Sequence, residues 1–195
     1  MDDQLINRIK RIYAAIQQVE ETDFSKLEAT TGSIGDLKTV GVNFRGGISD
    51  EQINNLAYTA IHNVAYLRDH LKKWAKVSGA NAETVEETIR NSQPLKIIID
   101  LAESDKHGYP SRNGGLSGLN PKILKVERFM QGKSGSWVGI SFALDGTPTV
   151  QGEGAIVISG TVVDADENHL GDLQEILRDA VASWEGLLGA MGIAF

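Results

Sequence analysis

Hydrophobic residues in the first half of the chain recur at the three- and four-residue spacing of α-helices. This spacing starts at Leu5 and predicts a first helix that continues to about Val19. A longer stripe follows the capping-box sequence Ser49-Asp50-Glu51-Gln52, and we expect this helix to end near Ser78, before Gly79. The stripe consists of Ile53, Ala57, Ala60, Val64, Leu67, Leu71 and Trp74. It predicts a packing seam against a helix of this chain or of a second copy.

Two shorter helices and a glycine-rich segment complete the first part of the chain. We expect Asn81 to cap a helix that reaches about Arg90, and Pro94 to lie in the first turn of a helix from Leu95 to about Lys106. The segment 29–47 contains five glycines and predicts a long loop with a short edge strand at 37–42. Residues 1–110 therefore predict an antiparallel helical bundle.

From residue 121 onward the pattern changes to the two-residue alternation of β-strands. We expect strands at 123–130, 137–144, 147–151 and 155–163, with Asp145-Gly146 as a hairpin turn. Helical spacing returns from Leu170 to about Met191. The sequence thus predicts an α+β fold, in which the bundle is followed by a three- to four-stranded antiparallel β meander and a C-terminal helix packed on the core. Residues 111–120 are a Gly-rich linking loop before the 121–195 part, and we expect one continuous domain.

Composition excludes several kinds of chemistry. The chain has 195 residues and no cysteine, which excludes disulfides, thiolate metal sites and a cysteine nucleophile. Its formal net charge of -7 disfavours broad electrostatic binding of nucleic acid. No apolar run approaches the roughly 18 residues of a membrane helix, so we expect a soluble cytoplasmic protein. The four histidines lack metal-motif spacing, and we expect neither a metal nor a cofactor.

The residues best suited to binding or catalysis lie at the end of the 95–106 helix. On a helical wheel Asp105 falls on the inward face, whereas Asp100 and His107 fall on the opposite side. A buried carboxylate needs a partner, so we expect Arg68 of the long helix to form an ion pair with Asp105 or Asp100. Elsewhere on the long helix, His70 lies at the edge of the seam, where it would line a groove or be half-buried.

The loop after this helix is a candidate anion site. Its members would be Lys106, His107, Arg112 and the amides of Gly108, Gly114 and Gly115. Basic side chains and backbone N–H groups together can hold a phosphate or another small anion. A simpler interpretation is that Lys106 and His107 only complement the negative end of the helix dipole.

A family resemblance rests on the same segment. Asp100-Leu101 and Lys106-His107, together with Leu67-Arg68-Asp69 on the long helix, resemble uncharacterised bacterial and phage-associated proteins of the broad HEPN-like helical class, over residues 50–110. The resemblance implies a metal-independent ribonuclease or nucleotide-processing enzyme, with His107 as the acid/base and Lys106 and Arg68 in support. Ribonucleases of this class carry an arginine and a histidine four to six residues apart on one helix, and this chain has no such pair.

Two hypotheses of function follow. The first is a non-catalytic binding or interaction protein, with a homodimer among its expected forms and a small anionic or nucleotide ligand at the end of the 95–106 helix. The alternative is the ribonuclease or nucleotide-processing enzyme that would use His107.

Overall fold

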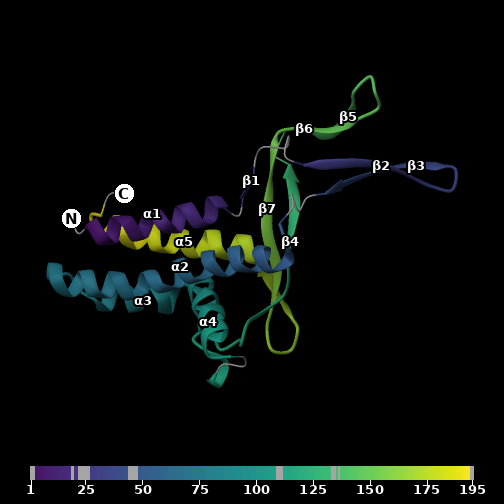
Figure 1. Cartoon of the computed structure of the whole chain (residues 1–195). Coiled ribbons are helices and arrows are strands. Elements are labelled where there is room, and N and C mark those ends of the chain that lie inside the picture. The colour runs from purple at the N-terminus through teal and green to yellow at the C-terminus, as the bar shows by residue number, and fades with distance from the viewer. Residues whose placement is uncertain are drawn as a thin grey trace.

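The chain folds into a helical part and a β part, shown in Figure 1. The structure is a computed structural model that describes residues 3–18, 20–21, 27–43, 48–108, 112–132, 135 and 137–193. The helices are α1 (Asp3–Gln18), α2 (Asp50–Ser78), α3 (Glu83–Asn91), α4 (Gln93–His107) and α5 (Leu173–Ala190). The strands are β1 (Glu20–Glu21), β2 (Glu28–Ile34), β3 (Leu37–Asn43), β4 (Lys122–Gly132), β5 (Val138–Phe142), β6 (Pro148–Gly152), β7 (Gly154–Val163) and β8 (His169–Asp172). The predicted α+β class is confirmed.

The long helix α2 begins and ends where local signals place it. The Ser49 hydroxyl accepts a hydrogen bond from the Gln52 amide at 3.3 Å, and the Gln52 side chain accepts one from the Ser49 amide at 2.9 Å. Gly79 ends the helix with φ 77°, in the left-handed region that glycine adopts without strain. The predicted seam is buried except for Trp74, which is half-buried.

The seam of α2 is covered by helices of the same chain. α1, α4 and α5 all pack on α2, and α4 also packs on α5. Trp184 of α5 is buried at the centre and donates its indole N–H to the Val64 carbonyl at 3.0 Å. Because the stripe is filled within one chain, an association between two copies would need another surface.

The main sheet differs from the predicted meander. β7 is its central strand and pairs antiparallel with β1, β4 and β8. The long β4–β7 pair runs from Lys122 opposite Val163 to Gly132 opposite Gly154, so β5 and β6 pair only with each other beyond its end. The prediction of a sequential meander was therefore wrong, since alternation locates strands but does not select their partners. β1 and β8 were missed because two and four residues are too short to show a period.

The predicted long loop at 29–47 was wrong at 29–34, which belong to β2, whereas the predicted edge strand at 37–42 is confirmed as β3. Residues 44–47 lie outside the part of the chain that the structure describes. Residues 28–43 form a second hairpin, β2–β3, around the two-residue turn Gly35-Asp36. Gly35 has φ 59° at the first position of this turn, as a type II′ hairpin requires. Gly32 hid β2 because it interrupts the β-branched residues on which the strand pattern depends.

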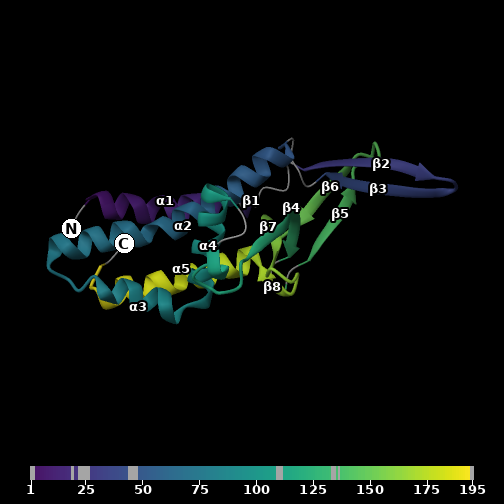
Figure 2. The same cartoon turned by 90° about the horizontal axis from the view of Figure 1, so that it is seen from below.

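The two hairpins extend together away from the helices, as Figures 1 and 2 show. We call residues 27–43 and 137–152, which contain these hairpins, the arm. β2 contacts β6, and Val42 and Val138 pack at the base of the arm on a small core of Val150 and Ile156. Most other arm residues are exposed. The arm is therefore held at its base and uncovered over much of its length.

Candidate functional site

The face shared by α2 and α4 contains a histidine–carboxylate pair that the sequence did not predict. His62 Nε2 lies 2.8 Å from Asp105 Oδ2. The rings of Tyr58 and Tyr66, one turn before and after His62, lie 6.4 and 5.2 Å from its ring centroid. Burial, followed by the nearby Asp105 charge, raises the pKa of Tyr58. His62 lies half-buried between the two helices.

The predicted Arg68 ion pair is wrong for both carboxylates. Arg68 Nε lies 3.4 Å from its sequence neighbour Asp69, whereas Asp105 pairs with His62. Arg68 lies six residues beyond His62 on α2, about 9 Å further along the helix axis. A helical wheel gives the angle of a side chain around its helix but not its level along the neighbouring helix, and level decides this pairing.

Asp100 has a different role from the predicted one. Its side chain is only 3% exposed and accepts hydrogen bonds from the Leu116 amide at 2.7 Å and the Ser117 amide at 2.8 Å. The predicted orientations of Asp100 and Asp105 are thus reversed, because the 112–120 loop folds over the α4 face that carries Asp100. A Cβ at Gly115 would lie 2.4 Å from the Asp100 carboxylate, so this contact requires glycine. Asp100 fastens the loop to the helix.

These contacts change the interpretation of the predicted anion cradle. The inward amides of the loop, at Leu116 and Ser117, already hold the Asp100 carboxylate. The Gly108 amide donates to the Ser104 carbonyl at 2.9 Å, which ends α4, so its predicted role in the cradle is wrong. Two amides of the loop are therefore already occupied by a carboxylate of the protein.

The remaining predicted site residues lie around this loop. Gly114 accepts from the Asn120 amide, and Arg112 begins a 3₁₀ turn, although its side chain lies outside what the structure describes. Lys106 is exposed, and His107 is 63% exposed with its Nε2 3.3 Å from Glu103. These residues share one end of α4 without converging on a described pocket.

His70 lies half-buried on α2, which is one of the two arrangements that the sequence predicted. Burial, and then the charge of Arg8, lower the pKa of its side chain below the usual 6.5. Its neutral form is therefore favoured in the folded protein.

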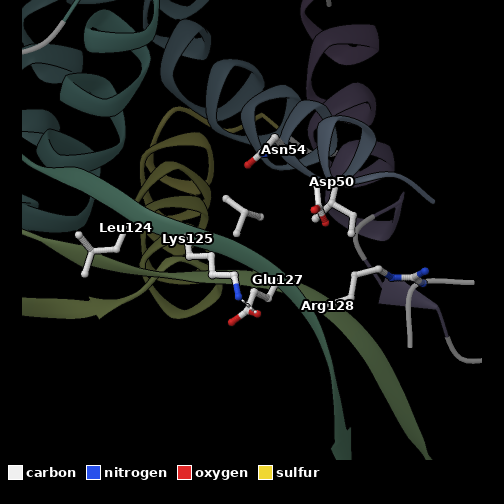
Figure 3. Close-up of a pocket in the computed structure, with 8 residues that line it drawn as sticks. Asp50, Asn54, Leu124, Lys125, Glu127 and Arg128 are labelled. Atoms are coloured by element: carbon white, nitrogen blue, oxygen red, sulfur yellow. Dashed lines mark ion pairs between the residues drawn. The ribbon is translucent and has the colours of Figure 1, made fainter. Parts of the chain in front are cut away.

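A hollow of about 290 Å³ lies between the start of α2 and β4 (Figure 3). Asp50 and Asn54 come from α2, and Glu127 lies on β4, where its carboxylate is 2.5 Å from Lys125. A bulge in β4 lies beside this hollow, opposite Gly160, where a Cβ would approach the Lys125 carbonyl to 2.4 Å. Sequence reasoning missed the hollow because its two walls are far apart in the chain. Its mixed charges favour no particular ligand.

The arm carries most of the exposed large hydrophobic side chains of the described residues. Among the described residues nine large hydrophobic side chains are exposed, and six of them belong to the arm. These six are Ile34, Leu37, Trp137, Ile140, Phe142 and Leu144. Only four of the 33 arm residues are charged: Glu28, Asp36, Lys38 and Asp145. The alternation of residues 138–144 was visible in the sequence, but their exposure was not.

Within the described part of the chain, no group of three or more histidine and acidic side chains is placed to hold a metal ion. None of the helices in that part has the length and apolar character needed to cross a membrane. Protein-family models, curated proteins and solved structures were each compared with the chain, and none of them matches it.

Proposed function

We propose that this chain is a non-catalytic binding protein that docks another polypeptide on its arm. The observation that carries the proposal is the concentration of exposed apolar side chains on two hairpins outside the main core. Exposed large apolar side chains that are concentrated in one part of a folded protein are typical of a protein–protein contact. Single exposed hydrophobic residues elsewhere, such as Val77 on α2, need no such explanation.

The energetics of the arm support the same proposal. Ile34 and Leu37 are 73% and 71% exposed, and Phe142 is 57% exposed. Covering each of these side chains would contribute about 1.5–3 kcal/mol. Few charges would have to be desolvated in the contact, because charged residues are sparse in the arm.

The α2–α4 face offers less for a ligand to bind. Asp105 pairs with His62, Glu103 with His107, and Asp69 with Arg68. Binding of a small anion or nucleotide at the end of α4 stays a prediction, as does the ribonuclease hypothesis for His107.

Site-specific photo-cross-linking in cells tests the docking proposal. A benzophenone amino acid is placed at Phe142 or Leu37, and the matched control carries it at Val77, which is 83% exposed on α2. We expect discrete polypeptide adducts from the two arm positions and none from the control. Equal adduct formation at all three positions, or none at the arm, would refute the proposal.

A further inference from the structure

We propose that the polypeptide docked on the arm is a second copy of this chain, joined by antiparallel pairing along the outer edge of β3. This inference rests on the proposed function of the arm. β3 pairs with β2 alone among the described strands, and β6 lies against β2. The other edge of β3 therefore presents a row of backbone groups that a further strand can pair with.

The register of the β2–β3 hairpin identifies which backbone N–H and C=O groups of β3 point away from β2. In an antiparallel pair with a two-residue turn, the residues that flank the turn bond each other, and every second pair along the strands does the same. Ile34 and Leu37 flank the turn. The alternation then directs the N–H and C=O groups of Lys38, Val40 and Val42 away from β2. A two-stranded ribbon is marginally stable in water, so a third strand on this edge would stabilise the arm.

The composition of β3 favours a second copy as the added strand. Edge strands that avoid pairing carry charged side chains, especially lysine, or a proline. β3 has no proline and one charge, Lys38, among its seven residues. A strand that pairs antiparallel with its own copy creates a two-fold axis, which is the commonest symmetry of oligomers. Full overlap of Leu37–Asn43 places Val40 opposite Val40 of the other copy and Lys38 opposite Val42. No charge then faces a like charge.

The same axis would gather exposed apolar residues of both copies. Val40 and Phe142 line one hollow of about 520 Å³ between the two hairpins. Phe142 would therefore lie close to the axis, with the fully exposed Leu144 on the adjoining turn. Strand pairing and apolar cover would occur on the same part of the arm, which links the free edge to the exposed surface.

The absence of cysteine provides a clean test of the pairing and its register. In the paired edges the two copies of residue 40 have Cα atoms about 5.5 Å apart, within disulfide range. The two copies of residue 38 are displaced by four residues, roughly 13 Å, and are out of range. Under mild oxidation we expect covalent dimers from V40C but not from K38C or V77C. Equal cross-linking by V40C and K38C would overturn the pairing.

Sedimentation of the purified full chain tests the dimer without cysteine. K38P removes an outward N–H and leaves the β2–β3 ladder intact, whereas K38S changes only the side chain and is its matched control. We expect a wild-type dimer whose Kd rises about tenfold or more in K38P and changes less than about threefold in K38S. Circular dichroism of each variant verifies the fold.

The outcomes separate this inference from the proposed function. A purified chain that is monomeric at all tested concentrations, together with arm-specific adducts to other polypeptides in cells, overturns the second copy and leaves docking on the arm in place. A monomer without arm-specific adducts overturns both.

Discussion

Replacing Asp100 by asparagine should release the 112–120 loop from α4 and destabilise the whole domain. The carboxylate is 3% exposed and accepts two short hydrogen bonds, from the amides of Leu116 and Ser117. Asparagine keeps the shape but offers only one acceptor oxygen, so one amide would face an NH₂ group. The loss of a charge-assisted bond, with a donor left unpaired, costs about 2–4 kcal/mol.

Urea unfolding followed by circular dichroism measures this loss, and thermal unfolding should show a midpoint lowered by roughly 5–15 °C. Hydrogen exchange reports on the two hydrogen bonds to Asp100 directly: the amides of Leu116 and Ser117 should exchange roughly 30-fold faster in D100N. The matched control is D105N on the same helix, whose carboxylate is 44% exposed and should contribute less than about 1 kcal/mol. If D100N unfolds within about 0.5 kcal/mol of the wild type and exchange at both amides is unchanged, Asp100 does not hold the loop.

Three further predictions concern neighbouring features. G115A should lower the free energy of unfolding by about 1–3 kcal/mol more than G118A does. Both glycines have φ 74°, but only a Cβ at residue 115 would clash with Asp100. Equal urea midpoints for the two variants would contradict the clash. The folded pKa of His70 lies below 6.5, so the unfolded chain binds its proton more tightly and stability falls as pH drops from about 7 through 6.5 to the folded value. In urea titrations at several pH values, H70Q should reduce the dependence of the unfolding free energy on pH. The same pH dependence in H70Q and wild type would contradict this role of His70. H107A should leave stability within about 0.5 kcal/mol of wild type, since His107 is 63% exposed; RNA cleavage by the wild type that H107A abolishes would support the ribonuclease hypothesis.

Several elements could be predicted because their signals lie within a few neighbouring residues. Ser49 and Gln52 form the capping box from their own side chains and amides, and Gly79 ends the helix through its own backbone angle. The seam of α2 is likewise a property of spacing along one helix. These features require no knowledge of what packs on them, so local chemistry was sufficient.

The candidate site could be predicted only in part from such local signals. Asp105 was expected to need a partner, and Asp100 was named as an alternative partner of Arg68; both carboxylates do have partners. The partners were wrong because Asp105 lies level with His62 rather than Arg68, and because a loop folds back over Asp100. Neither fact is contained in a helical wheel.

The arm shows the same division on a larger scale. Alternation and turn residues located the β5–β6 hairpin, but only the pairing of β4 with β7 left it outside the main sheet. Capping, periodicity and turn preference act over a few residues and can be recognised in the chain alone. Strand partners, the level of one helix against another and the exposure of an apolar face depend on contacts between distant segments, so the tertiary structure decided them.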